Sequence, residues 1–436
     1  MRSRILIATT VGCLAGLTAP LFAQRGDAAN ATPAADDPVR ALVGRLNLER
    51  YKETVRGLTQ FGDRRQGTAR NRAATDWIEA QLKSYGCTNT ERITYEYTGR
   101  QIQNDSTRRV DSLARAARGL PPLAGRGGGG RGGAGGAAGP SGPGSGRVDA
   151  NGNPVKGYPA RTGVNSNPLL QPDTALRRIN MEPDSPGERQ EVFCTKVGTT
   201  RPDEMYIIGA HMDGHGFGAA ANDDGSGTAL VMELARVFSS PDVQTERSIR
   251  FALWNNEETG LNGARAYVEQ RKDLQGIENP KGSGKYPEPR WLGMIQHDMM
   301  MWDHGAPGPD GKVAPDQRRE ADVNIEFRDT SKFAPDAVKL AWYFRRMNEK
   351  YATDYPAAVG DRMSNTDSDP FKDLVPAISL RENERLAHTG SGWNPTWHQP
   401  IDVMSTFSDN DFRLGLNAAQ TTLSAVATLT GAKIRK

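Results

Sequence analysis

The feature that most constrains the fold of this chain is a regular alternation of strand-like and helix-like segments after Gly187. Short apolar runs predict strands near 190–196, 205–210, 248–254, 291–296 and 376–380. Segments with apolar residues three and four positions apart predict helices near 227–238, 261–271, 333–351 and 408–430. Because strands that alternate with helices are typical of parallel sheets, the sequence predicts an α/β domain with a largely parallel central sheet flanked by helices.

The region before this alternation has two parts of different character. Residues 37–86 show helical periodicity and end at a glycine, and the alternating stretch 90–97 predicts a strand. Residues 98–118 are then polar and basic, and 119–147 consist mainly of Gly, Pro and Ala. Such a composition cannot bury enough apolar surface to offset its ordering entropy.

We therefore expect a single domain over 37–436, interrupted by a low-complexity insertion at about 98–186 whose Gly-rich part is disordered. The Gly-rich part is similar to the RGG tracts of RNA-binding proteins, which gives a second interpretation. The lack of aromatic residues favours a flexible insertion, so no nucleic-acid partner is expected. The net charge of +3 indicates no particular partner.

The N-terminus has the pattern of a secretory signal. A basic start, an apolar run over 5–17 and a small residue at Ala23 predict a signal peptide over 1–23, followed by a disordered lead-in over 24–36. The apolar run is too short to span a bilayer comfortably, and no other stretch could do so. A lipoprotein anchored at Cys13 is the alternative, but the apolar run continues past that residue. We expect a secreted or periplasmic protein with no membrane span after signal removal.

Two cysteines, Cys87 and Cys194, remain after the signal. One lies just before the expected strand 90–97 and the other near the end of 190–196, so pairing of these strands in antiparallel fashion would bring the two thiols together. An exported protein could then form one disulfide. Two buried free thiols are an equally acceptable interpretation.

Candidate metal ligands follow four of the predicted strands. Since ligands bind outside the carboxyl ends of the strands in open α/β sheets, these residues are expected at one edge. They are His211 and Asp223 after strand 205–210, Glu257 and Glu258 after 248–254, Asp298 after 291–296, and His398 in the loop after 376–380. Histidines with carboxylates and without cysteine suit zinc or a similar ion in a hydrolytic site.

The number of donors allows one metal or two. One ion would use three or four of these groups, whereas two histidines with three carboxylates suit a pair of ions bridged by one carboxylate. Of the adjacent Glu257 and Glu258, one would bind metal and the other would act as general base. Asp213 could accept a hydrogen bond from the imidazole of His211, and Asp402 from that of His398.

Other chemistry finds less support. His215, His297 and His304 lack partners at ligand spacing and are interpreted as bystanders. No HExxH motif is present, which excludes the thermolysin-like arrangement by motif, and no G-x-S-x-G motif supports a serine hydrolase.

Five segments together resemble a known family. GAHMD, NDDGSGTALVMELARVF, SIRFALWNNEETGLNGARAYV, QHDM and WHQPID are similar to the two-zinc exopeptidase family of secreted bacterial leucyl aminopeptidases and carboxypeptidase Q, within the clan MH metallopeptidases. The resemblance covers about 187–430 and extends to the helical pair at 40–86. It implies a mixed sheet of about eight strands, a cis peptide between Asp223 and Asp224, and peptide substrates.

The resemblance also assigns roles to the candidate residues. It implies two Zn²⁺ per chain, with His211 and Asp298 on one ion, Glu258 and His398 on the other, and Asp223 between them. Glu257 matches the general base. The hydrolysis would start with water bound between the two ions, and a free α-amine near the metals would restrict cleavage to N-terminal residues.

One departure concerns the residue before the last histidine. Several family aminopeptidases carry a tyrosine there, which helps to stabilise the oxyanion, but this chain has Trp397. Trp393 and Trp397 could wall a substrate pocket or serve simple packing.

An aminopeptidase is the function that the resemblance favours. The alternatives are a carboxypeptidase or dipeptidase, a glutaminyl cyclase working with one zinc, and a non-catalytic ectodomain of the same fold. The last is disfavoured because all five ligands and the glutamate are present. The oligomeric state cannot be inferred from the sequence.

Overall fold

The computed structural model describes residues 37–97, 164–303, 323–361, 363, 365–382, 394 and 396–435. The predicted signal peptide, the lead-in and the Gly-rich stretch lie outside these ranges. Among the helices of the described residues, none combines the length and apolarity that crossing a lipid bilayer requires.

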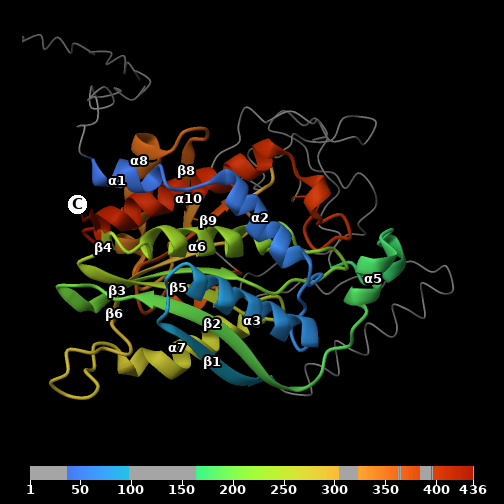
Figure 1. The fold of residues 1–436 in the computed structure, drawn as a ribbon, viewed down its shortest axis with the longest axis horizontal. Coiled ribbons are helices and arrows are strands. Elements are labelled where there is room, and N and C mark those ends of the chain that lie inside the picture. The colour runs from blue at the N-terminus through green and yellow to red at the C-terminus, as the bar shows by residue number, and fades with distance from the viewer. Residues whose placement is uncertain are drawn as a thin grey trace, which may run out of the picture. The chain divides into compact units, whose positions relative to one another are not determined.

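In the described part of 37–436, an eight-stranded sheet forms the centre (Figure 1). Its order is β1-β2-β5-β3-β6-β9-β7-β8. The strands are β1 Thr90–Tyr97, β2 Gly187–Lys196, β3 Arg201–His211, β5 Arg247–Trp254, β6 Arg290–His297, β7 Val323–Phe327, β8 Ala357–Gly360 and β9 Ala377–Glu382. Two short strands, β4 Val243–Gln244 and β10 Lys433–Ile434, pair separately.

The sheet is mixed, with a parallel centre. Strands β5, β3, β6 and β9 are consecutive neighbours and run parallel, while β1, β2 and β7 pair antiparallel with their inner neighbours. The carboxyl ends of the four parallel strands therefore lie at one edge, with His211 opposite Trp254 in the register. The predicted fold class is confirmed, and so is the strand number that the resemblance implied.

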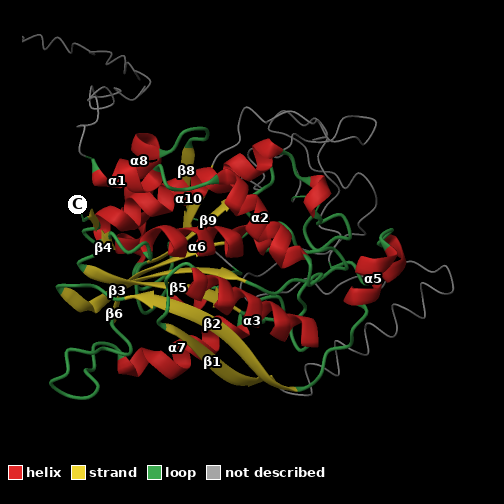
Figure 2. Cartoon of the chain, in the orientation of Figure 1, coloured by secondary structure: helices red, strands yellow, loops and turns green. Residues whose placement is uncertain are grey.

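Helices cover both faces of the sheet (Figure 2). They are α1 Pro38–Val43, α2 Leu48–Thr59, α3 Ala69–Ser84, α5 Thr174–Asn180, α6 Gly225–Phe238, α7 Asn262–Arg271, α8 Ala334–Tyr351 and α10 Asp409–Leu429. Alternation along β5 separates two cores: Phe251 and Leu253 pack with α2, α3, α6 and α10, whereas Ala252 and Trp254 pack with α7. Burial on both sides explains why the central strands are continuous apolar runs.

The two cysteines form a disulfide in the structure. Cys87 precedes β1, Cys194 lies in β2, and Thr90 is opposite Cys194 in the antiparallel register. Of the two interpretations left open by the sequence, the disulfide is the one found.

Part of the expected insertion has regular structure. Residues 164–186 contain a 3₁₀ turn at Pro168–Leu170 and helix α5. The bounds of the insertion, at about 98–186, stay a prediction. Asp173 caps α5 by accepting hydrogen bonds from two backbone N–H groups. Polar side chains of this segment bond to the loops near the candidate site, and these contacts, which composition does not reveal, order it.

Candidate metal centre

The first half of the candidate site is built directly on strand ends. His211 is the last residue of β3, and Asp298 is the first residue after β6, the parallel neighbour of β3. His211 Nε2 lies 3.8 Å from Asp298 Oδ1, and its Nδ1 lies 2.9 Å from the carbonyl oxygen of Asp213. Arg381 of β9 donates to Asp298 Oδ2 at 2.5 Å. We call His211 and Asp298 the strand half.

Asp223 lies between this half and the rest of the site. Its Oδ1 is 3.3 Å from His211 Nε2, and its Oδ2 is 3.0 Å from His398 Nε2. The carboxylate of Asp402 accepts the backbone N–H groups of Asn222 and Asp223 at 2.8 and 3.1 Å, which fixes the loop. Asp223 is thus placed where one carboxylate can reach two ions.

The carboxylate of Asp224, unlike that of Asp223, accepts hydrogen bonds from backbone N–H groups. The peptide between Asp223 and Asp224 is cis, as the resemblance implied. The carboxylate of Asp224 accepts the N–H of Gly227 at 2.8 Å and so caps α6, and it also accepts the N–H groups of His211 and Met299. These bonds join the loop to the ends of β3 and β6.

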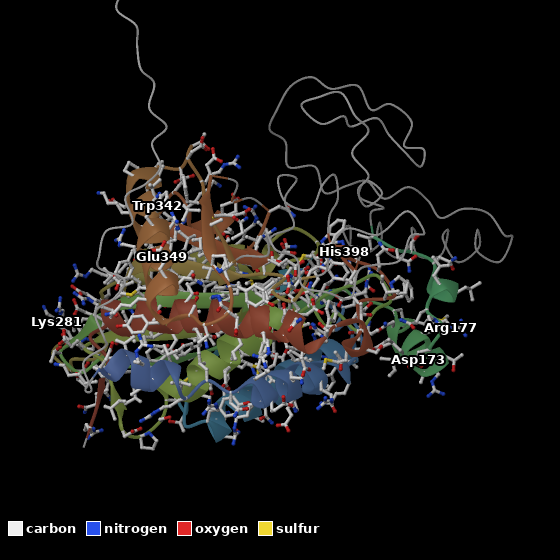
Figure 3. All side chains as sticks on the ribbon, turned by 90° about the horizontal axis from the view of Figure 1, so that it is seen from above. Asp173, Arg177, Lys281, Trp342, Glu349 and His398 are labelled. Carbon is white, nitrogen blue, oxygen red and sulfur yellow. A yellow bond between two sulfur atoms is a disulfide. The ribbon has the colours of Figure 1, made fainter. Side chains whose placement is uncertain are left out.

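The second half of the site comes from loops. Glu258 Oε2 lies 2.8 Å from His398 Nε2 and 3.0 Å from His215 Nε2. The two imidazole rings meet edge to face with centroids 4.1 Å apart. We call His215, Glu258 and His398 the loop half; Figure 3 shows His398 on the side of the molecule where α5 also lies.

His215 is the one candidate donor that the sequence did not indicate. It was interpreted as a bystander because a single histidine in a glycine-rich turn has no partner in the local sequence. Its partners, Glu258 and His398, come from other loops. The other two histidines differ: His297 is buried against Thr422, with Nε2 2.8 Å from Oγ1, and His304 lies outside the described residues.

Both supporting aspartates act differently from the expectation. Asp213 contacts His211 mainly through its carbonyl oxygen, while its carboxylate accepts the backbone N–H groups of Glu257 and Glu258 at 3.0 and 3.5 Å. Asp402 bonds to the loop of Asp223 rather than to the ring of His398. Each carboxylate is directed by a turn toward a neighbouring backbone, which sequence spacing alone does not indicate.

The two tryptophans cannot be treated alike. The indole of Trp397 stacks on the imidazole of His398, with centroids 3.7 Å apart, whereas Trp393 lies outside the described residues. Trp397 therefore packs on His398, one of the candidate metal ligands. A role of either tryptophan in a substrate pocket stays a prediction.

The loop half is held by residues of the segment 164–186. Asn165 donates its backbone N–H to the carbonyl of His398 and its amide to that of Gly216. Gln171 donates to the carbonyls of Phe217 and Pro400 at 2.8 and 2.9 Å. Since buried carbonyls need donors, these amides fix the relative position of the loops that carry His215 and His398.

Two further residues, one between α2 and α3 and one in α3, brace the loops of His215 and of Glu258. The buried guanidinium of Arg64 donates to the carbonyls of Met212, Ala219 and Ala220 at 2.7 to 2.9 Å. Asn71 of α3 exchanges amide hydrogen bonds with Asn255, the residue that begins the loop of Glu257. Neither role has a sequence motif.

Burial and crowding of charges set the protonation of the site. Burial and the carboxylates of Glu258, Asp367 and Asp298 raise the pKa of Glu257 well above its ordinary value, although His211 opposes this. Burial lowers the pKa of His398, but Glu258 and Asp223 more than offset it and raise the value to about 9. Burial raises the pKa of Asp213 to about 6 and that of Asp402 to about 7.

The donor atoms fit divalent ions. The donor residues form three sets, and within each set the donor atoms lie within 4.8 Å of one another. The sets are His215 with Glu258 and His398; His211 with Asp224 and Asp298; and His211 with Asp223 and Glu258. Among the buried side-chain atoms that form no hydrogen bond of acceptable geometry with any described residue, four belong to these donor residues: Asp223 Oδ2, Glu258 Oε1, His398 Nδ1 and His215 Nε2. Unpaired buried donors and acceptors are rare, so a cluster of them at a convergent set of ligands indicates metal binding.

Comparisons with known proteins agree with this geometry. The chain is 39% identical over 83 residues to leupeptin-inactivating enzyme 1 of Streptomyces exfoliatus, covering 19% of this chain and 18% of that protein. It is 44% identical over 74 residues to aminopeptidase YwaD of Bacillus subtilis, covering 17% and 16%. The chain therefore matches less than a fifth of the length of either relative.

A comparison of structures reaches further along the chain. The fold is similar to that of BSAP, a zinc aminopeptidase from Bacillus subtilis, with a TM-score of 0.53 and 15% identity over 90% of this chain and 96% of that one. The model of peptidase family M28 matches residues 192–421, which is more than half of the chain and includes every predicted metal ligand. On this match, together with the sheet and the ligand cluster, the chain belongs to peptidase family M28.

Proposed function

We propose that this protein is an exported aminopeptidase that uses two Zn²⁺ ions and Glu257 as general base. The observation that carries the proposal is the convergence of two predicted ligand pairs, His211 with Asp298 and Glu258 with His398, on the carboxylate of Asp223. When bound there, zinc ions would supply Lewis-acid activation of water and of the scissile carbonyl.

The chain's own residues have separable roles in this proposal. Asp213 and Asp402 hold the backbone of the ligand loops by accepting N–H groups, so that the donors are in place before substrate arrives. Glu257 is beside Glu258 and is buried, and its raised pKa suits a group that takes up a proton and returns it to the leaving amine. Its backbone N–H is anchored on Asp213.

The proposed preference for N-terminal residues is supported by the acidic side chains around the site and by the names of similar proteins. Carboxylates of Glu257, Asp298 and Asp367 surround the site, and an acidic site favours the ammonium group of a free N-terminus. YwaD and BSAP carry the name aminopeptidase, while carboxypeptidase Q of Xenopus laevis is also similar, at 31% identity over 83 residues. The acidic site is therefore the observation that favours an aminopeptidase over a carboxypeptidase in this proposal.

Export is supported by two independent observations. The N-terminal pattern up to Ala23 is that of a signal peptide. The disulfide between Cys87 and Cys194 suits an oxidising compartment, because cytosolic thiols are kept reduced. Detection of a mature protein that begins after Ala23 outside the cytoplasm would test this part of the proposal.

The central test is Glu257→Gln, which keeps the size of the side chain and removes its basicity. We expect turnover of an aminoacyl-nitroanilide to fall about 10²–10⁴-fold, the usual contribution of general-base catalysis, while two metal ions stay bound. Glu269→Gln, at an exposed position of α7, is the matched control. Near-wild-type turnover of the Glu257 variant would contradict the assignment of the base.

The substrate class is tested with the wild-type protein. A free N-terminal substrate and an N-blocked dipeptide are compared with and without a chelator. Cleavage of the free substrate alone, lost with the chelator, is expected. Cleavage of the N-blocked dipeptide would instead favour the carboxypeptidase alternative, and a metal content of one per chain would contradict the two-metal arrangement.

A further inference from the structure

We propose that His215 is a sixth metal ligand, which completes a His₂Glu set in the loop half with Glu258 and His398. This inference rests on the proposed metal-dependent function and goes beyond the five ligands that the sequence predicted. The three donor atoms lie within 4.8 Å of one another, and Nε2 of His215 is 3.0 Å from Glu258 Oε2. Two imidazoles and a carboxylate are a donor set that zinc uses in catalytic sites.

The backbone directs this side chain into the site. Gly216, at φ +98°, packs so closely on His398 that an added Cβ would lie 2.3 Å from the carbonyl oxygen of that residue. Asn165 then ties the two loops together by bonding to the carbonyls of both residues. The turn that carries His215 is therefore fixed against His398, and Nε2 of each imidazole lies close to Glu258 Oε2, at 3.0 and 2.8 Å.

The hydrogen-bonding state of His215 also points to a ligand. Its side chain is only 10% exposed, and its Nε2 forms no hydrogen bond of acceptable geometry with any described residue, despite its short distance to Glu258. Leaving a buried polar atom unsatisfied costs about 1–3 kcal/mol. Coordination of a metal ion by Nε2 would satisfy this atom together with the unpaired Oε1 of Glu258.

The consequence is that the two metal positions differ chemically. The loop half offers two imidazoles and one carboxylate, whereas the strand half offers one imidazole and the carboxylate of Asp298, with Asp223 shared. Nitrogen-rich sites favour Zn²⁺, Co²⁺ and Cu²⁺, while oxygen-rich sites accept harder ions such as Mn²⁺. The loop half is thus expected to bind the borderline ions more tightly.

The test uses the whole protein, stripped of metal and titrated with Co²⁺. In the wild type, two ions per chain are expected, and three histidines should show paramagnetically shifted ring signals: His211, His215 and His398. His215→Gln retains a side chain that can donate to Glu258, and His215→Phe retains the ring that packs on His398. Both should lose at least about tenfold in the Co²⁺ affinity of one position and show two shifted histidines.

The outcomes separate this inference from the proposed function. Two bound ions with only two shifted histidines in the wild type would overturn the role of His215 and leave the function intact. Wild-type affinity in His215→Gln would likewise overturn it, because hydrogen bonding to Glu258 would then suffice. A wild type that binds fewer than two ions would contradict the two-metal function itself. Circular dichroism of both variants separates loss of a ligand from loss of the fold.

Discussion

The two halves of the candidate site reach similar burial by different means. The strand half is placed by the sheet: His211 ends β3, Asp298 follows β6, and the parallel register of these neighbours sets their separation. The loop half is placed by side-chain hydrogen bonds from elsewhere in the chain, above all those of Asn165 and Gln171. The position of the strand half thus depends on the sheet. The position of the loop half depends on individual side-chain hydrogen bonds to irregular backbone.

This difference has a physical cause. A strand end inherits its position from a ladder of backbone hydrogen bonds and from a core on both faces, so a ligand there needs little further support. A loop has no such ladder, and its buried carbonyls must find other donors. His398 even adopts a left-handed backbone conformation, at φ 56°, which persists only when the surroundings determine it.

The largest effect is expected at the residue between the halves. Asp223→Asn keeps the shape of the side chain but removes the charge that both halves share. Activity should fall more than about 10³-fold, since metal ions supply several kcal/mol of transition-state stabilisation. The metal content should drop below two per chain, measured by elemental analysis after gel filtration. Retention of two ions with full activity would show that Asp223 does not join the halves.

A pair of single substitutions tests whether the halves are independent. His211→Ala leaves the strand half with Asp298 and the shared Asp223, so one ion should be lost and the other retained. His398→Ala leaves His215 and Glu258 in the loop half, so that ion should be retained with an affinity weaker by about 10–100-fold. Metal titration of the stripped variants measures both. An equal loss of metal affinity in His211→Ala and His398→Ala would contradict the inference that the loop half has more donors than the strand half.

A smaller effect is expected where the loop half is braced. Gln171→Met removes the donor from the carbonyls of Phe217 and Pro400 and nearly preserves volume. Loss of these two buried hydrogen bonds should lower the free energy of unfolding by about 1–3 kcal/mol in total, measured by urea denaturation. Cobalt affinity should decrease at the loop half and stay unchanged at the strand half.

The control for this brace is Lys281→Ala, in a loop at the other end of the molecule (Figure 3), where neither stability nor metal affinity should change. If Gln171→Met weakened both halves equally, the brace would act on the whole domain rather than on the loops. If it weakened neither, other contacts such as those of Asn165 and Arg64 would be enough to hold the loops.

The sequence by itself predicted the centre of the sheet and the candidate ligands at its edge, but not strands β7 and β8. Apolar runs of strand length define β3, β5 and β6, and the polar residues that follow them must gather where parallel strands end. This rule alone was enough to predict that His211 and Asp298 lie at the same edge of the sheet. His398 was found from its place after β9 and from the WHQPID segment, which resembles the family.

Only the tertiary structure decided the contacts that bring separate loops together. His215 meets Glu258 and His398 through side chains more than 40 positions apart in the sequence, and no local pattern encodes such a meeting. The same holds for the carboxylates of Asp213 and Asp402, which accept backbone groups instead of imidazoles. Strand periodicity is a local property of the sequence, whereas the partner of a buried polar atom depends on which distant segment folds against it.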